Sequence, residues 1–341
     1  MKIMSSQVLP NSLVFLLLLV GCQNAINRDK AFEHDLQESA RPWSYEPTGR
    51  ADSSFTFAII SDLNGGEREG VFDVAVQQIN LLRPEFILSV GDLIDGGTED
   101  MNELKTQFDS FDERVAKAKS PLFYVGGNHD LTNLVMRKYW MERYGRRYYH
   151  FVYNNVLFLI LDSEDYDETR MQEIYLARAR YIELADGPNP ELAAEAAYLQ
   201  MPERNLGNIG DEQSAYFEKI IKNNPQVGWI FLFMHKPVWK AEGEGNLSRI
   251  EQALYNKKYT VFNGHVHRYS HALRNDSDYI TLGTTGGSQT FDDAFDHITL
   301  VSFDGGAPAI ANIRMDGILD KTGRIPLGGD TLCFQASKCI D

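Results

Sequence analysis

The sequence predicts an α/β fold in which polar residues follow the strands. Apolar segments at residues 55–60 and 86–90 flank a stretch with helical spacing at residues 71–82, which is the order of a strand, a helix and a parallel strand. Each apolar segment is followed by a carboxylate, Asp62 and Asp92. Because ligands of open α/β sheets bind at the carboxyl ends of the strands, these carboxylates mark a candidate site.

The same alternation continues toward the C-terminus. Residues 102–117 are expected to form a polar amphipathic helix, and the apolar segment at 122–125 a third strand. Two apolar segments on either side of Tyr153-Asn154-Asn155 predict a β-hairpin over residues 148–161. Further strands are expected at residues 228–233, 259–262, 278–282, 297–303 and 308–314.

The composition indicates a globular protein with a substantial core. The chain has 341 residues, of which 43% are hydrophobic and 24% are charged, and this fits one large domain or two small ones. Its formal net charge is −15. Such a surface repels nucleic-acid backbones and anionic lipid headgroups, so no nucleic-acid-binding surface is expected.

The first residues have the pattern of an export signal. Lys2 precedes an apolar run at residues 13–20 that is too short to span a bilayer. The sequence Leu19-Val20-Gly21-Cys22 resembles the bacterial lipobox, whose cysteine is diacylated and becomes the mature N-terminus. The alternative is an ordinary secretory signal in which Cys22 is incidental.

The lipobox resemblance implies a lipoprotein signal peptide at residues 1–21, lipidation of Cys22 and a polar tether at residues 22–52. The lipid would anchor the protein to a membrane of the cell envelope. Because Gln23 follows the cysteine, the resemblance to Gram-negative lipoproteins favours the outer membrane, with the protein facing the periplasm or the cell surface.

The two other cysteines, Cys333 and Cys339, lie close together near the end of the chain. An exported protein meets an oxidising compartment, which favours a disulfide between them. A zinc site is a poor alternative, since no histidine or third cysteine accompanies the pair. Two unpaired thiols on a frayed tail are the remaining possibility.

Residues 164–210 interrupt the alternation of strands and helices. Acidic residues cluster at 164–168, and a helical stretch rich in Ala and Glu follows. This pattern predicts a helical cap, inserted into a domain at residues 53–315 that is followed by a tail at residues 316–341. A solvated helical excursion without function is an equal alternative, because acidic clusters usually form exposed faces.

Polar residues follow five predicted strands, and together they resemble a known series. The blocks are Asp62-Leu63-Asn64, Gly91-Asp92-Leu93-Ile94-Asp95, Gly127-Asn128-His129-Asp130, Met234-His235-Lys236-Pro237 and Gly264-His265-Val266-His267. The series resembles the calcineurin-like metallophosphoesterase superfamily over roughly residues 55–300, and four of the five blocks match its pattern fully. Tyr269 is similar to a residue of the related purple acid phosphatases, although their iron-binding tyrosine in the second block is absent.

This resemblance implies a single catalytic domain with a four-layer α/β/β/α sandwich and a metal-dependent phosphoesterase activity. Two alternatives keep the fold. One is a phosphodiesterase acting on cyclic nucleotides or lipid headgroups, and the other is a catalytically weakened surface lipoprotein that uses the domain for binding. The presence of His129 and Asp95 favours the enzyme, since a binding protein gains nothing from a proton donor and the residue that orients it.

The resemblance also implies two divalent metal ions that share Asp92. One would be bound by Asp62, Asn64, Asp92 and His267, and the other by Asp92, Asn128, His235 and His265. This mixture of carboxylate, carboxamide and imidazole ligands suits Mn, Fe, Ni or Zn. The two ions would polarise the phosphoryl oxygens of a phosphoester substrate and hold the hydroxide that attacks phosphorus.

The imidazole of His129 lies outside the implied ligand set. It would therefore be free to protonate the leaving alkoxide, with Asp95 orienting and charge-stabilising it in the family's manner. A structural role beside the metal ligands is the alternative for His129. Asp130 would be the structural partner within the same motif.

The first block departs from the family pattern at Asn64, where a histidine is usual. A carboxamide oxygen is a weaker and harder ligand than an imidazole nitrogen. The first metal position is therefore expected to bind its ion loosely, to prefer Mn²⁺ or Mg²⁺, or to fill only with substrate. The alternative is a conservative exchange of ligands that leaves a normal enzyme.

Overall fold

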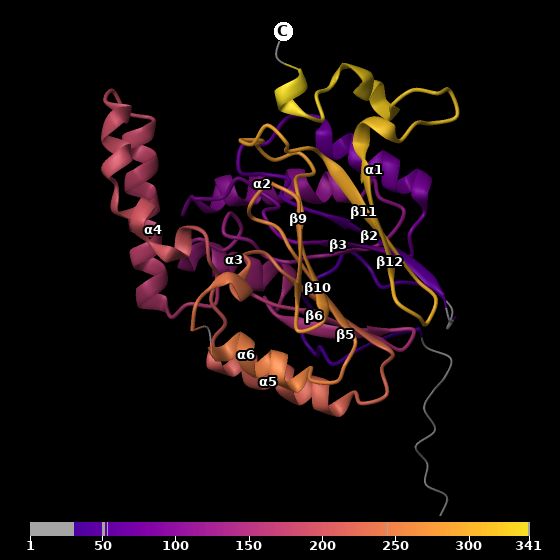
Figure 1. Ribbon diagram of the computed structural model, residues 1–341. Helices are drawn as coiled ribbons and strands as arrows, with labels where there is room; N and C mark the ends of the chain where they lie inside the picture. The colour runs from indigo at the N-terminus through magenta and orange to yellow at the C-terminus, as the bar shows by residue number, and fades with distance from the viewer. Residues whose placement is uncertain (1–30, 50–51, 53, 244, 340–341) are drawn as a thin grey trace, which may run out of the picture.

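Two β-sheets lie face to face in the structure, a computed structural model that describes residues 31–49, 52, 54–243 and 245–339 (Figure 1). Among these residues the larger sheet has seven strands, in the order β1 (Phe32–His34), β5 (Tyr149–Tyr153), β6 (Val156–Ile160), β7 (Trp229–Met234), β8 (Tyr259–Asn263), β10 (Ser277–Thr281) and β9 (Ser270–Arg274). The smaller sheet has five in the same described part, in the order β12 (Ala309–Arg314), β11 (His297–Phe303), β2 (Phe55–Ile60), β3 (Phe86–Ser89) and β4 (Leu122–Phe123).

Neighbouring strands are parallel at the centre of each sheet. β2 pairs in parallel with β3, and β3 pairs in parallel with β4. In the larger sheet β6, β7, β8 and β10 are successive parallel neighbours. The prediction of parallel strands joined by crossovers is confirmed, and it places the carboxyl ends of several strands at one edge of each sheet.

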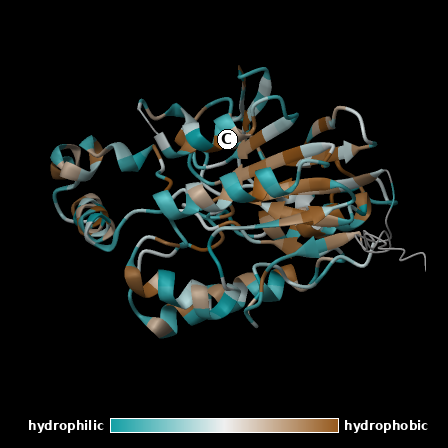
Figure 2. Cartoon of the chain, turned by 90° about the horizontal axis from the view of Figure 1, so that it is seen from below, coloured by the Kyte–Doolittle hydropathy of each residue, from teal (hydrophilic) through white to brown (hydrophobic). Residues whose placement is uncertain are grey.

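The core between the sheets is mainly aromatic. The ring of Phe57 on the smaller sheet lies 5.4 Å from that of Phe158 and 5.1 Å from that of Phe231 on the larger one. Phe123 stacks on Phe151 across the same interface, with 4.4 Å between ring centroids. Figure 2 shows these apolar strands in brown, while the helices around them carry many hydrophilic residues. Alternate residues of each strand therefore fill the space between the sheets.

Helices cover the outer face of each sheet. The smaller sheet packs against α1 (Val71–Leu82), α2 (Met101–Val115) and α3 (Leu134–Tyr144), and the larger one against α5 (Asp211–Asn223) and α6 (Gly245–Ala253). The second face of the same strands supplies the apolar contacts, for example through Ala58 and Leu232. The four-layer α/β/β/α sandwich expected from the resemblance is confirmed.

The segment at residues 164–210 contains a helical arm that projects beside the sandwich (Figure 1). Its long helix α4 (Glu168–Ala185) is followed by the 3-10 turns η1 (Pro190–Glu195), η2 (Ala197–Gln200) and η3 (Pro202–Arg204). The base of the arm is fixed to the core, because the buried Lys236 ammonium lies 2.9 Å from the Glu164 carboxylate and 2.8 Å from the Glu203 carbonyl oxygen. The arm therefore has a fixed attachment beside β7.

Two expected domain boundaries are wrong. Residues 31–49 are not a tether, because β1 pairs with β5 of the larger sheet and Trp43 is buried against its neighbours. Residues 316–339 are not a loose tail, since Phe334 is buried and the 3-10 turns η6 (Pro326–Thr331) and η7 (Ala336–Lys338) follow the turn η5 (Met315–Gly317). Both segments belong to the packed domain.

The predicted signal peptide at residues 1–21 and the lipidation residue Cys22 lie outside the described residues. Within the described part of the chain, no helix has both the length and the apolar character needed to cross a membrane.

Candidate metal centre

The predicted ligands meet where strands of the two sheets end. Asp92 follows β3 of the smaller sheet and His235 follows β7 of the larger one, and their side chains approach to 3.2 Å. His267, which follows β8, lies 3.4 Å from the carboxylate of Asp62 after β2. The Asn128 amide oxygen lies 3.1 Å from His235 Nε2. The site is therefore built across the junction of both sheets.

The ligand atoms form two groups that share one carboxylate. Asp92, His235 and His265 each offer an atom within 4.8 Å of the others, and so do Asp62, Asp92 and His267. This is the division between two metal positions that the family resemblance implies. Below, the first position is the group with Asp62, Asn64 and His267, and the second position is the group with Asn128, His235 and His265; Asp92 belongs to both.

Each of the three imidazoles donates one ring N–H to a backbone carbonyl oxygen. His235 Nδ1, His267 Nδ1 and His265 Nε2 lie 2.8, 2.6 and 2.9 Å from the carbonyl oxygens of Val90, Ser288 and Arg204, respectively. Because a carbonyl oxygen only accepts hydrogen bonds, these nitrogens carry the proton. The other nitrogen of each ring is left as a lone-pair donor that faces the neighbouring ligands, which is the arrangement of metal-bound histidines.

The amide of Asn64 is held in one orientation. Its Nδ2 group donates to the Leu93 carbonyl oxygen at 2.8 Å. The Oδ1 atom is buried and has no hydrogen-bond partner within the described chain. A buried oxygen without a partner costs free energy unless a ligand satisfies it, so this atom fits a divalent cation.

Four of the ligand residues have a strained backbone. The φ angles of Asp62, Asp92, His265 and His267 are 45°, 57°, 71° and 57°, in the left-handed region that residues with a Cβ atom seldom adopt. Such strain persists only where the surrounding structure enforces it, and it concentrates at functional sites. This left-handed backbone conformation turns the four side chains toward the shared centre, just after the strands end.

Two glycines leave room for the ligand carboxylates. A Cβ atom at Gly264 would clash with the Asp62 carboxylate, and one at Gly127 would clash with the Asp92 carboxylate. Glycine is therefore required at both positions, because the carboxylate of a neighbouring block lies too close for any side chain.

The electrostatics of the centre favour bound positive charge. Burial raises the pKa of Asp92, but the imidazoles of His235 and His129 outweigh burial and hold this pKa well below its usual value. Burial lowers the pKa of His235 and of His267, yet the carboxylates of Asp92 and Asp62 raise both to about 9. The carboxylates thus attract cations, either as protons on the rings or as metal ions that displace them.

His129 lies beside the ligands with one nitrogen fixed. Its Nδ1 atom donates to the backbone carbonyl oxygen of Asp95 at 2.7 Å, and its backbone N–H donates to Asp92 Oδ1 at 2.9 Å. Burial is the main cause that lowers the pKa of His129. Its neutral form therefore keeps the proton on Nδ1, and Nε2 is the atom that can exchange a proton with a bound molecule.

The expected role of the Asp95 side chain needs a correction. The resemblance implies that the Asp95 side chain orients and charge-stabilises His129, whereas in the structure the backbone carbonyl oxygen of Asp95 accepts the hydrogen bond from His129 Nδ1 and the residue is exposed to solvent. The orienting hydrogen bond is thus independent of the side-chain type at position 95.

Asp130 ties the second and third blocks together. Its buried carboxylate accepts hydrogen bonds from the backbone N–H groups of Gly127, Leu93 and Ile94, at 2.8, 2.9 and 3.2 Å. Burial, with the charge of Asp92, raises its pKa to about 8. This matches the structural role expected for it.

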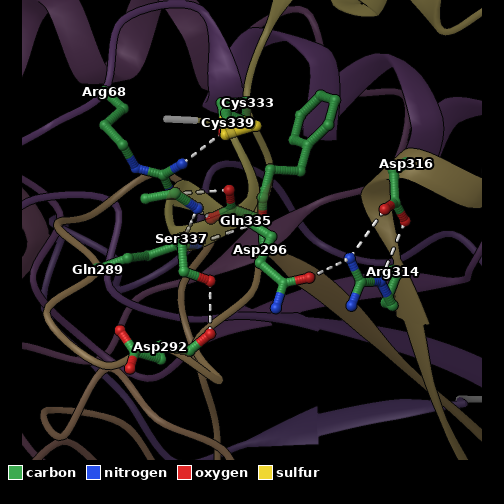
Figure 3. The surroundings of a disulfide bond; sticks show 12 residues. Arg68, Gln289, Asp292, Asp296, Arg314, Asp316, Cys333, Gln335, Ser337 and Cys339 are labelled. Carbon is green, nitrogen blue, oxygen red and sulfur yellow. Dashed lines mark hydrogen bonds and ion pairs between the residues drawn. A yellow bond between two sulfur atoms is a disulfide. The ribbon is translucent and has the colours of Figure 1, made fainter. Parts of the chain in front are cut away.

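A disulfide joins Cys333 to Cys339 near the C-terminus (Figure 3). A series of hydrogen bonds through Arg68 links this segment to the first position. Arg68 donates to the carbonyl oxygens of Cys333 and Gly287, at 2.7 and 3.0 Å, and forms an ion pair with the buried Asp296 at 2.6 Å. The backbone N–H of Gly287 in turn donates to the carbonyl oxygen of Asp62 at 2.8 Å.

Sequence reasoning missed the groups that hold the ligands from behind. The carbonyl oxygens of Val90, Leu93, Ser288 and Arg204 leave no trace in residue type, since every residue has one. Arg178 of α4, whose guanidinium lies 3.4 Å from His129 Nε2, was also missed. It lies in the insertion, where no motif distinguishes it from the neighbouring charged residues.

The fold and the paired ligand groups together define a metal-dependent hydrolase. The sequence pattern of the calcineurin-like phosphoesterases matches residues 55–269, and the chain belongs to this family of enzymes that hydrolyse phosphoester bonds.

Solved structures show the same fold at low sequence identity. A dimetal phosphatase from Danio rerio superimposes with a TM-score of 0.52 at 14% identity, over 76% of this chain and 99% of the other. A purple acid phosphatase from yellow lupin (Lupinus luteus) gives 0.50 at 12% identity, over 78% of this chain and 52% of the other. A search of curated proteins finds no match.

Proposed function

We propose that the protein hydrolyses phosphoesters at this centre, with His129 as the group that protonates the leaving oxygen. The observation that carries the proposal is the shared carboxylate of Asp92. It contributes to both ligand groups and also accepts the backbone N–H of His129, so a proton donor is fixed beside two candidate metal positions.

The residues divide the work of the reaction. Two divalent ions, when bound, would supply Lewis-acid activation of the phosphoryl group and of the attacking water. Asp92 would hold the two positions at a fixed separation. The Asp95 carbonyl oxygen keeps Nδ1 of His129 protonated and turns Nε2 outward. When His129 is in its imidazolium form, the proton on Nε2 passes to the leaving oxygen as the ester bond breaks, and the ring is left neutral with its remaining proton on Nδ1.

The donor set supports Mn, Fe, Zn or Ni as the metals. The second position offers two imidazoles with a carboxylate and an amide, which suits the softer of these ions. The first position has one imidazole and the oxygen of Asn64, which favours the harder Mn²⁺ or Mg²⁺ and weaker binding.

The proposal is tested with purified protein and two chromogenic substrates. The protein should hydrolyse p-nitrophenyl phosphate or bis(p-nitrophenyl) phosphate with added Mn²⁺ and lose this activity to a chelator. The preferred substrate separates a phosphomonoesterase from a phosphodiesterase. His129→Gln should lower kcat by roughly 10²- to 10⁴-fold. Metal-loaded protein that is inert toward every phosphoester tested would instead favour the binding lipoprotein.

Asp95→Asn is the matched control for His129→Gln. The exchange keeps the backbone carbonyl that bonds His129 and changes only an exposed side chain. Activity should therefore stay within about twofold of wild type, since surface substitutions away from special features have small effects. A large loss would restore a role for the Asp95 carboxylate in catalysis.

We also propose that a lipid on Cys22 anchors the enzyme in the cell envelope, at the outer membrane and facing the periplasm or surface. The lipobox-like sequence before Cys22 supports this, and the disulfide between Cys333 and Cys339 is compatible with export. Cys22→Ala should move the protein from the membrane fraction to the soluble fraction. Mass spectrometry that finds an unmodified mature N-terminus would rule lipidation out.

A further inference from the structure

The helical arm places a cation beside the proton donor. Arg178 lies on α4, and its Nη2 atom is 3.4 Å from Nε2 of His129. This is the nitrogen of His129 that the Asp95 carbonyl oxygen leaves free. An element outside the strand-end motifs therefore reaches the position where the leaving oxygen of a substrate would lie.

Arg178 has no carboxylate partner within the described chain, unlike the other arginines of its helix. Arg170 forms an ion pair with Glu173 at 2.7 Å, and Arg180 forms one with Glu183 at 2.6 Å. In a protein with a net charge of −15, a half-buried guanidinium that contacts His129 but has no carboxylate partner among the described residues is available to an anionic ligand. Its N–H groups match the oxygen spacing of phosphate.

Two glycines lie beside His129 and this guanidinium. A Cβ atom at Gly65 would lie 3.2 Å from a ring carbon of His267 and 3.4 Å from Nε2 of His129, so any larger side chain there would enter the space next to both rings. A Cβ atom at Gly97 would lie 3.1 Å from Nη1 of Arg178. A side chain at either glycine would thus crowd the rings of His129 and His267 or the guanidinium of Arg178.

We propose that Arg178 is a substrate-binding residue, which contacts an oxyanion of the phosphoester next to the leaving oxygen. The proposal rests on the proposed phosphoesterase function and gives the inserted arm a part in it. The oxyanion has two sources, the phosphoryl group that is transferred and a second anionic group on the leaving part of the substrate. Both have the chemistry that a guanidinium recognises, and the experiment separates them.

The experiment uses the full chain loaded with Mn²⁺, as wild type, Arg178→Ala, Arg178→Lys and Arg180→Ala. Binding of inorganic phosphate is measured by calorimetry, and kcat and KM are measured with p-nitrophenyl phosphate and with a sugar bisphosphate. Arg178→Ala should weaken phosphate binding and raise KM by on the order of 10- to 100-fold, the range for hydrogen bonds to charged groups. Arg178→Lys should lose less, and Arg180→Ala should match wild type.

The outcomes assign the source of the oxyanion or overturn the proposal. Weaker binding of inorganic phosphate by Arg178→Ala assigns the contact to the transferred phosphoryl group. A raised KM for the bisphosphate alone assigns it to the leaving part. If Arg178→Ala equals Arg180→Ala in every assay, or changes only the pH profile of kcat, the proposal is wrong while an active wild type keeps the proposed function. If wild type is inactive, the proposed function fails, and calorimetry still decides whether Arg178 binds phosphate.

Discussion

The two metal positions share Asp92 but differ in how the fold supports them. The second position has two imidazoles among its candidate ligands. His235 is fully buried, and its Nδ1 atom is hydrogen-bonded to the carbonyl oxygen of Val90, directly after β3. Asn128 Oδ1 lies 3.1 Å from Nε2 of the same ring. Its ligands thus follow β3 and β4 of the smaller sheet and β7 and β8 of the larger one. Two imidazoles would give this position a high affinity for transition metals.

The first position depends on loops. The Asp62 carbonyl oxygen accepts the backbone N–H of Gly287, and His267 donates to the carbonyl oxygen of Ser288, so the turn at residues 284–288 holds both ligands. That turn is itself bonded to the C-terminal segment through Arg68. With one imidazole where the second position has two, this position is expected to bind transition metals more weakly. We therefore expect the two positions to differ in metal affinity.

Asp92→Asn should have the largest effect, because it changes the one ligand that both positions use. Changes in residues that only support a ligand already cost 10- to 100-fold in metal affinity, so loss of the shared carboxylate should cost more than about 100-fold at both positions. Elemental analysis after dialysis should find less than one ion per chain. Asp95→Asn, on the same loop, should bind metal like wild type.

A result in which Asp92→Asn retains one tightly bound ion would contradict the shared position. It would mean that Asp92 serves only one group and that the two positions are independent.

Two histidine variants should then separate the positions. His265→Ala removes a ligand of the second position only, and His267→Ala removes one of the first only. Because the second position is expected to be the tighter, His265→Ala should cause the greater loss of bound metal. His267→Ala should leave one ion per chain on dialysis. Equal losses in the two variants, measured by elemental analysis, would mean that the positions do not differ in affinity.

Asn64→His should strengthen the weaker position. An imidazole can donate one N–H to the Leu93 carbonyl, as the amide does now, and present its other nitrogen to the ion. Retention of metal should rise by about tenfold or more, and preference should shift from Mn²⁺ toward Zn²⁺ and Fe. If wild type already holds two ions after exhaustive dialysis and the variant changes neither number nor preference, the first position is not weak.

The parts of the fold and site that the sequence predicted are those with local signals. The strand at residues 55–60 and the helix at residues 71–82 have the observed bounds, because apolar runs and helical spacing are properties of a short segment. The polar residues after the strands marked the ligands for the same reason. These signals sufficed for the α/β class and for marking the residues that meet at the centre, whereas the four layers and the assignment of ligands came from the family resemblance.

The parts that were missed depend on distant partners. β1 is a three-residue strand in a polar segment, and only its pairing with β5 makes it a strand. The orienting contact of Asp95 comes from a backbone carbonyl, which its side chain gave no reason to expect. Arg178 reaches His129 because of the path of the arm, which neighbouring residues do not determine.

Loss of the disulfide should have the smallest effect on the centre and should affect only the first position. The bond closes a loop with a sequence separation of 6, so chain entropy predicts a loss of about 2 kcal/mol in the free energy of unfolding when both cysteines become serine. Loss of the bond would loosen the C-terminal segment around Cys333, whose carbonyl oxygen accepts a hydrogen bond from Arg68. Denaturant unfolding of the double variant and of wild type measures this loss of stability.

The consequence for metal binding follows the same chain of contacts. If the C-terminal segment loosens, Arg68 loses one acceptor, while its ion pair with Asp296 and its bond to Gly287 remain. The turn that holds Asp62 should therefore relax only slightly, and affinity at the first position should fall by about two- to fivefold, the effect of one net hydrogen bond. The second position, supported from β3 and β7, should not change. Metal titrations of the Cys333→Ser/Cys339→Ser variant and of wild type test this. Equal weakening at both positions would show that the C-terminal segment stabilises the whole domain and does not act on the first position alone.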